Sequence, residues 1–237
     1  MKLSAPIYHL KRQARLLSRQ ENIPLHQALD RLAFKEGVSG WSALVARASA
    51  AAPAAKLFAR LSPGDLVLVG ARPGQGKTLM SLELAVEAMK SSNCSVFFTL
   101  EYTEKDLRDR FRDLCVDLAQ FDHLFEFDNS DVISAEYIAK TLASAPRGTL
   151  VVVDYLQLLD QRRENPELAI QIGMLKSFAR ERGLIMVFIS QIDRSYDPSA
   201  KPCPDIRDVR LPNPLDLTLF NKTCFLNQGE VRFRAAG

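Results

Sequence analysis

One eight-residue segment, Ala-Arg-Pro-Gly-Gln-Gly-Lys-Thr at positions 71–78, constrains the fold more than any other part of this chain. It follows the apolar residues 66–69 and precedes a helical pattern at 79–90, which is the strand, loop and helix order of a phosphate-binding loop. Gly74 and Gly76 allow the backbone to curl, so that successive N–H groups point at phosphate oxygens beside the positive end of the following helix. The alternative, a glycine-rich turn with an incidental lysine, does not account for this context.

The side chains of this loop predict that the chain binds ATP and Mg²⁺. Lys77 places an ammonium group on the β- and γ-phosphates, and the Thr78 hydroxyl is a suitable Mg²⁺ ligand. The residues that we expect to contact the nucleotide are Ala71, Arg72, Pro73, Gly74, Gln75, Gly76, Lys77, Thr78 and Leu79.

Two further apolar segments lead to carboxylates, as strands do at the ligand-binding edge of a parallel sheet. Residues 150–153 lead to Asp154, which we expect to hold Mg²⁺ through water. Residues 96–100 lead to Glu101, a candidate to orient or deprotonate an attacking water. The alternative for Glu101 is an acid that caps the next helix, a role that Thr103 could equally fill.

A third such segment, 187–190, ends at Gln191. An amide at this place is able to sense the γ-phosphate and to pass its presence or loss to the adjoining loop. The predicted catalytic residues are therefore Lys77, Glu101 and Gln191.

From residue 61 onward, apolar runs alternate with amphipathic stretches, which predicts an α/β domain with a mostly parallel central sheet flanked by helices. We expect strands at 65–70, 95–100, 149–154 and 184–190, with helices near 77–90, 103–120, 132–144 and 166–182. Near the C-terminus, two apolar runs flank residues 227–230, as in a β-hairpin.

The first fifty residues read as a separate small helical module, because apolar residues recur there at three- and four-residue spacing. Its only tryptophan, Trp41, is expected in the core of the module. The predicted division is a small basic helical module at 1–50, a linker at 51–56, and an ATPase domain at 57–237.

Charge is divided unevenly between these parts. Residues 1–60 hold ten Lys or Arg and three Asp or Glu, a net charge of +7, whereas the whole chain carries only +3. This asymmetry suggests an anionic partner for the module, with nucleic acid the leading candidate. The alternative is a solvated helix face that keeps the protein soluble.

The cysteine pattern and the lack of an apolar targeting segment predict a cytoplasmic location. The four cysteines show no CxxC or Cys/His spacing, so we expect reduced thiols in a cytosolic protein. No apolar run reaches membrane-spanning length, and the basic start of the chain lacks the apolar segment of a secretory signal. We therefore expect no membrane contact.

Four segments in order, ARPGQGKT, FFTLE, VVVDYLQLL and ISQIDRS, resemble the motor domain of DnaB-type replicative helicases, a branch of the RecA-like ATPases. Ala71 in place of the first loop glycine is usual in that family. The resemblance covers roughly residues 57–226, and it implies a RecA-like P-loop NTPase fold. It also implies that Lys77 and Thr78 hold nucleotide and Mg²⁺, and that Glu101, Asp154 and Gln191 are the base, the Mg²⁺-site acid and the sensor.

The same resemblance implies a hexameric ring around single-stranded DNA, with two loops of each subunit facing the channel. In this chain the loops correspond to about 160–168 and 193–210. The cations available there for DNA phosphates are Arg162, Arg163, Arg194, Lys201, Arg207 and Arg210.

The sequence departs from the family pattern at both ends. The basic helical module stands where the family has a large primase-contacting domain, and it is similar to short helical modules at the ends of other bacterial proteins. The family's Lys-x-Arg-x-Gly stretch, which supplies an arginine finger to the neighbouring subunit, is not evident. Lys222, Arg232 and Arg234 are candidate substitutes, without an assignment.

Two hypotheses for function follow. The first is a Mg²⁺-dependent, DnaB-like helicase ATPase that couples ATP hydrolysis to binding or translocation of single-stranded DNA. The second is a nucleotide-dependent regulatory or assembly ATPase that acts on a protein partner through the N-terminal module, with slow hydrolysis and no unwinding.

Overall fold

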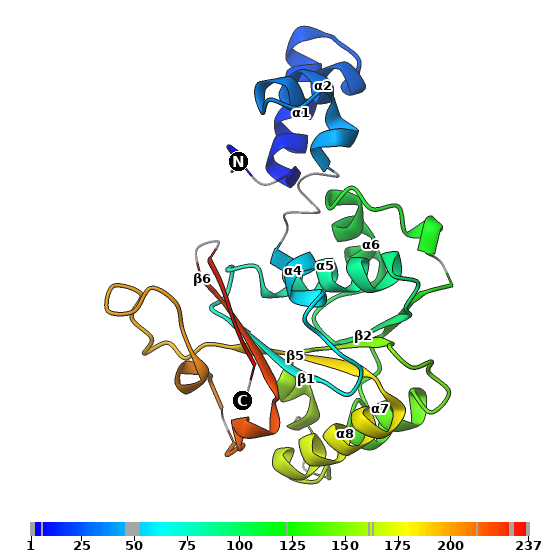
Figure 1. Cartoon of the computed structure of the whole chain (residues 1–237), viewed down its shortest axis with the longest axis vertical. Coiled ribbons are helices and arrows are strands. Elements are labelled where there is room, and N and C mark those ends of the chain that lie inside the picture. Colours follow the sequence, from blue (N-terminus) through cyan, green and yellow to red (C-terminus); the bar gives the residue numbers. More distant parts are fainter. Residues whose placement is uncertain are drawn as a thin grey trace.

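In the computed structural model, a small helical module at the N-terminal end stands apart from a larger α/β body (Figure 1). Among the residues described, no helix has both the length and the apolar character needed to cross a membrane. The structure describes residues 3–5, 7–45, 53–121, 123–160, 162, 164–211, 213–227 and 230–235.

A mostly parallel sheet forms the centre of the body. Its strands are β1 (Leu66–Ala71), β2 (Ser95–Thr99), β3 (Phe125–Asp128), β4 (Leu150–Asp154), β5 (Ile185–Gln191), β6 (Lys222–Asn227) and β7 (Glu230–Ala235). In the described part of the chain these seven strands have the order β3-β2-β4-β5-β1-β6-β7. Every neighbouring pair is parallel except β6 and β7. The predicted α/β fold is thereby confirmed.

Helices cover both faces of the sheet, which explains why the inner strands are continuously apolar. Leu66 and Leu68 of β1 belong to one core, whereas the alternating Val67 and Val69 belong to the other. The second core also takes side chains from α4 (Pro53–Phe58), α5 (Lys77–Lys90) and α6 (Glu104–Asp113). The first core takes side chains from α7 (Ala135–Thr141) and α8 (Leu168–Arg182).

The four predicted strands lie within one residue of their observed bounds, and α5 begins and ends where predicted. Two expectations were wrong. The edge strand β3 was missed, because its residues are only partly buried and alternate with charge. The helix predicted at 103–120 ends at Asp113, and the chain turns at Cys115, which has a φ of 62°.

The N-terminal module is a small bundle built on α1 (Ile7–Glu21) and α2 (Leu25–Lys35), followed by a helical turn at 41–45. Leu10, Ala33 and Leu44 form one of its buried clusters, and the partly buried Trp41 packs against them. The prediction that Trp41 belongs to the module's core is confirmed.

The boundary between module and body differs in part from the predicted linker at 51–56. Residues 46–52 lie outside the described residues. Residues 53–56, however, belong to α4, whose Ala54 and Leu57 are buried against the body. The three-residue spacing of these two apolar side chains places them on one face of a helix. The alanine-rich composition of the segment made this pattern hard to recognise in the sequence.

Candidate nucleotide-binding site

The glycine-rich loop joins the end of β1 to the start of α5, as its sequence predicts. Gly74 and Gly76 have φ values of 77° and 87°, a region that residues with side chains rarely adopt. Apart from the adjacent residues of the loop, no described heavy atom lies within 4 Å of where a Cβ would stand on either glycine. The loop therefore borders open space at the N-terminal end of α5, where backbone N–H groups and the helix dipole favour an anion.

Thr78 and Asp154 meet beside this loop, although they are far apart in the sequence. The Thr78 hydroxyl donates a hydrogen bond of 3.3 Å to Oδ2 of Asp154, which has no exposed surface. The other carboxylate oxygen, Oδ1, is buried without a hydrogen-bond partner in the described residues. A hydroxyl beside an unsatisfied carboxylate oxygen is the oxygen donor set that suits Mg²⁺, so these residues fit the predicted ion.

Burial raises the pKa of Asp154 to about 6, and the nearby Glu101 carboxylate contributes to the rise. Lys77, the Thr78 hydrogen bond and Arg110 act in the opposite direction and lower this pKa. Lys77, Glu101 and Arg110 therefore all lie within electrostatic reach of Asp154. A cation bound at Asp154 would favour its ionised form.

The raised pKa of Asp154 predicts how pH affects the metal-free chain. In the unfolded chain this carboxyl has its ordinary pKa of 3.8, so between about pH 4 and 6 the folded state holds a proton that the unfolded state has lost. Stability therefore falls as pH rises through this window, by at most about 3 kcal/mol. We expect Asp154→Asn to stabilise the chain at pH 8 and much less at pH 4.5, measured by urea unfolding in a chelator. An equal gain at both pH values would contradict this.

Glu101 lies just beyond β2, on the same edge of the sheet. Its backbone N–H donates to the Thr99 hydroxyl at 3.0 Å, and its side chain is exposed. The cap of α6 is Thr103, which forms a reciprocal capping box with Asp106. The alternative of Glu101 as the helix cap is therefore wrong. Within the described residues its carboxylate has no hydrogen bond or ion pair.

A cavity of about 530 Å³ opens beside Glu101, and its lining includes a cation, Arg110, that was not predicted as a site residue. The Arg110 guanidinium carbon lies 4.6 Å from the centre of the Tyr102 ring. A sequence signal was available, since Arg110 follows the capping Thr103 by seven residues, or two helical turns, and so shares its face. The cavity is lined by Glu101, Tyr102, Asp106, Asp109, Arg110 and Asp113.

Gln191 ends β5 directly beside Ala71, the first residue of the loop. Its backbone oxygen accepts a 2.8 Å hydrogen bond from the N–H of Arg210, and the Arg210 oxygen accepts one of 3.0 Å from Gln157. The structure thus brings the end of the predicted DNA loop at 193–210 against the predicted sensor.

The six cations predicted to contact DNA differ in their exposure and in their ion pairs. Arg194, Arg207 and Arg210 are exposed. Arg162 forms an ion pair of 3.2 Å with Asp131, and Arg163 lies outside the described residues.

Lys201 is engaged inside its own loop. It forms ion pairs of 2.7 Å with both Asp205 and Asp208, so two carboxylates already neutralise it. We expect Lys201 to shape the loop more than it attracts phosphate.

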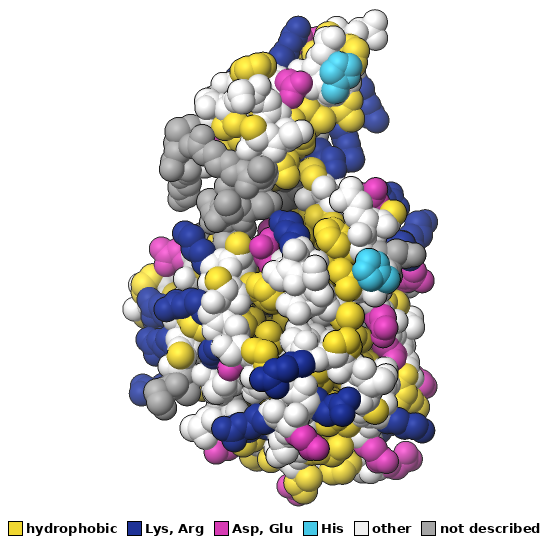
Figure 2. Space-filling view, turned by 45° about the vertical axis from the view of Figure 1, so that its right-hand side comes forward, with side chains coloured by type: hydrophobic (Ala, Val, Ile, Leu, Met, Phe, Trp, Pro, Cys, Tyr) yellow, Lys and Arg dark blue, Asp and Glu magenta, His cyan; other side chains and the backbone are white. Residues whose placement is uncertain are grey.

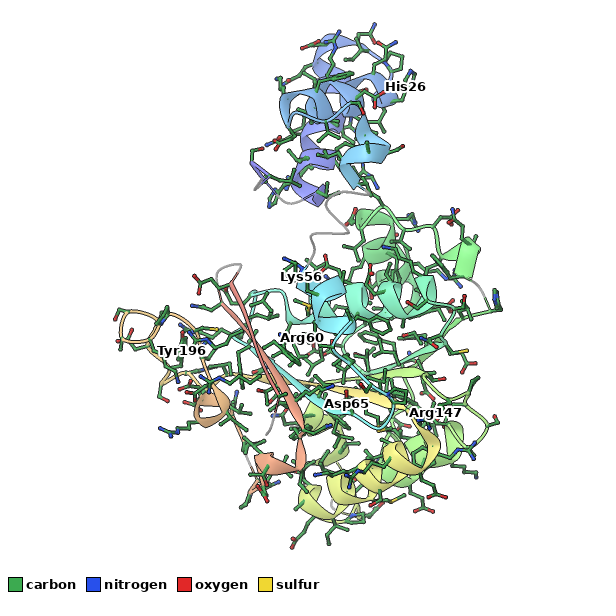
Figure 3. All side chains as sticks on the ribbon, viewed as in Figure 1. His26, Lys56, Arg60, Asp65, Arg147 and Tyr196 are labelled. Atoms are coloured by element: carbon green, nitrogen blue, oxygen red, sulfur yellow. The ribbon has the colours of Figure 1, made fainter. Side chains whose placement is uncertain are left out.

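Lys222 lies at the end of the sheet opposite the phosphate loop of its own subunit. It pairs with Val67 in register, whereas the phosphate loop follows Ala71 at the other end of β1. Its ammonium group donates to the backbone oxygen of Arg60 and forms an ion pair with Asp65. Figure 3 labels Arg60 and Asp65 on the segment that leads into β1. Lys222 is thus held within its own subunit, an observation against a role as a finger, whereas Arg232 and Arg234 stay candidates.

Comparison with known proteins agrees with this geometry. The family described as DnaB-like helicase C terminal domain matches residues 54–122 and 117–213, more than half of the chain. The matched residues include the phosphate loop, Glu101, Asp154 and Gln191.

Curated relatives include two replicative DNA helicases named DnaB. The protein from Mycoplasma genitalium is 22% identical over 197 residues, which cover 67% of this chain and 42% of that protein. The protein from Synechocystis is 27% identical over 181 residues, which cover 63% of this chain and 21% of that protein. The chain thus spans less than half the length of either relative.

Solved structures show the same fold. The ATPase domain of G40P has a TM-score of 0.58 at 21% identity, covering 71% of each chain. A DnaB-like replicative helicase, solved in a study of its interactions with primase, has a TM-score of 0.59 at 20% identity, covering 92% of this chain and 66% of that one. These neighbours confirm the predicted RecA-like fold. Together with the family match across the site, they establish that the chain belongs to the DnaB-like helicase C-terminal domain family.

Proposed function

We propose that this chain is a Mg²⁺-dependent ATPase that couples hydrolysis to single-stranded DNA. The observation that supports it most directly is the buried contact between Thr78 and Asp154 beside the glycine-rich loop. The exposed Glu101 carboxylate on the same sheet edge adds a base. Membership of a helicase family supports a motor that acts on a nucleic acid.

In this mechanism each residue has one task. Lys77 and the loop N–H groups hold the β- and γ-phosphates, and Glu101 orients the attacking water in line with the leaving group and accepts its proton. Thr78 and Asp154 would hold Mg²⁺, which when bound neutralises charge on the phosphate oxygens. Arg110, close to Asp154 and Glu101, adds positive charge from within the same subunit.

Coupling to DNA would pass through Gln191. Loss of the γ-phosphate changes the contacts of its amide, and its backbone oxygen is bonded to Arg210 at the end of the 193–210 loop. The exposed Arg194 and Arg207 on this loop are suited to DNA phosphates. By family resemblance, this arrangement operates in a ring of subunits, of which six is the expected number.

The test is ATP hydrolysis by the wild-type chain with and without single-stranded DNA. We expect DNA to raise kcat several-fold, with less effect at high salt because phosphate contacts are screened. Strand separation on a forked duplex is the next assay.

A regulatory ATPase is the second candidate, favoured by two observations. The N-terminal module precedes the region matched by the helicase family, and Lys222 is held by Asp65 and so is not free to act as a finger. Tight ATP binding with slow turnover that is indifferent to DNA would support this candidate and contradict the helicase proposal.

A further inference from the structure

The solvent-facing side of α1 carries three arginines on one face. Arg12, Arg15 and Arg19 are all exposed, and their spacing places them within about 60° around the helix and about 10 Å along it. We call these three residues the arginine face. The opposite side of α1 presents Leu10 and Ala14 to the core of the module. Figure 2 shows Lys and Arg side chains along one edge of the module.

The carboxylates of the module are used elsewhere. Glu21 forms an ion pair with Arg31 on α2. Asp30 accepts the backbone N–H of Trp41 at 2.8 Å. Glu36, at the end of α2, accepts the backbone N–H of the N-terminal segment at 3.0 Å. These three are the acidic residues of the first fifty, so none of them neutralises the arginine face.

The arginine face lies beside a contact between α1 and the motor domain. Lys11, the neighbour of Arg12, donates a hydrogen bond of 2.6 Å to the backbone oxygen of Arg112 at the end of α6. Successive helical residues are turned by 100°, so Arg12 points away from this contact, whereas Arg15 lies one turn further along the side of Lys11 and is exposed. Within the described residues, the three guanidinium groups have no hydrogen bond or ion pair.

We propose that the arginine face binds the phosphate backbone of duplex DNA. Three unpaired guanidinium groups on a rigid helix suit a rigid row of phosphates, which duplex DNA presents at one charge per about 1.7 Å of its axis. The site is separate from the loop at 193–210 proposed for single-stranded DNA.

The same face is poorly suited to a membrane surface. A helix that lies on a bilayer must insert its apolar side among the lipids. In α1 that side, which includes Leu10 and Ala14, is already buried in the module. Among the described side chains beside the arginine face, Leu16, which is 51% exposed, is the large apolar one.

The experiment measures binding of a labelled duplex of about twenty base pairs to the full chain, without nucleotide, by fluorescence anisotropy at several salt concentrations. The test variant combines Arg12→Gln, Arg15→Gln and Arg19→Gln. We expect it to bind at least tenfold more weakly at low salt, and the slope of log K against log salt to fall by about 2 to 3. Circular dichroism checks that the variant stays folded.

A matched control combines Lys90→Gln, Arg108→Gln and Arg112→Gln, three exposed cations that already pair with carboxylates. It removes the same charge and should keep most of the duplex affinity. Equal losses in both variants would show that only net charge matters and would overturn the proposal. So would unchanged duplex binding in the test variant, a larger loss of single-stranded than of duplex DNA binding in that variant, or stronger binding to phosphatidylserine vesicles than to the duplex.

Discussion

Replacing Glu101 by glutamine should lower kcat for ATP hydrolysis by about 10²- to 10⁴-fold, while ATP still binds with nearly wild-type affinity. Glutamine keeps the size of the side chain but cannot accept a proton from water. The effect is expected to be large because nothing in the described chain engages this carboxylate, and because helix α6 is capped by Thr103. Phosphate release measures kcat, and a fluorescent ATP analogue measures affinity.

Two comparisons make this result specific. Lys77→Ala should lower both nucleotide affinity and turnover, because its ammonium group contacts phosphates in the ground state as well as in the transition state. Asp113→Asn removes a charge from the lining of the same cavity and should change kcat little. Similar losses in Glu101→Gln and Asp113→Asn would show that the cavity's charge matters and that Glu101 is not the base.

The second large effect is expected on stability, from the ion pair between Lys222 and Asp65. Their side chains are only 15% and 8% exposed, so the pair behaves as a buried one. Lys222→Ala leaves the Asp65 carboxylate buried without its cation, which should cost about 3–5 kcal/mol. For a chain of this size, that lowers Tm by roughly 6–20 °C.

Thermal and urea unfolding measure this cost. Asp65→Leu combined with Lys222→Met should be less destabilised than the sum of the two single variants, because no charge remains unpaired. Arg234→Ala, an exposed cation on the same hairpin, should have little effect. If Lys222→Ala lost turnover without losing stability, Lys222 would be a finger after all.

The sequence predicted the centre of this structure well, for physical reasons. Strands buried on both faces must be apolar along their whole length, and β4 stops being apolar where Asp154 reaches the sheet edge. The phosphate loop could also be predicted from its glycine spacing, because glycine is the residue that readily adopts the positive φ values at Gly74 and Gly76. These features are local in sequence, and the structure has them where they were expected.

What could not be predicted depends on partners distant in the sequence. Lys222 and Asp65 are 157 residues apart, and nothing in the local pattern tells a paired lysine from a free one. The carboxylates that engage Lys201 are close in sequence, but the fold of the loop decides that both turn toward it. The choice between Glu101 and Thr103 as a helix cap likewise required the helix geometry.

The closed base of the 193–210 loop allows the rest of the loop to vary in length. Its two ends are joined as a short antiparallel bridge, with Ile192 opposite Val209, and the Asp193 N–H bonded to the Asp208 oxygen at 2.7 Å. Because the ends are held together at the base, doubling the length of the chain between them adds only about 0.6 kcal/mol of closure entropy. Insertions at the tip are therefore nearly neutral for folding. Such a loop can change its length and charge, and with them its nucleic-acid preference, without disturbing the pocket beside it.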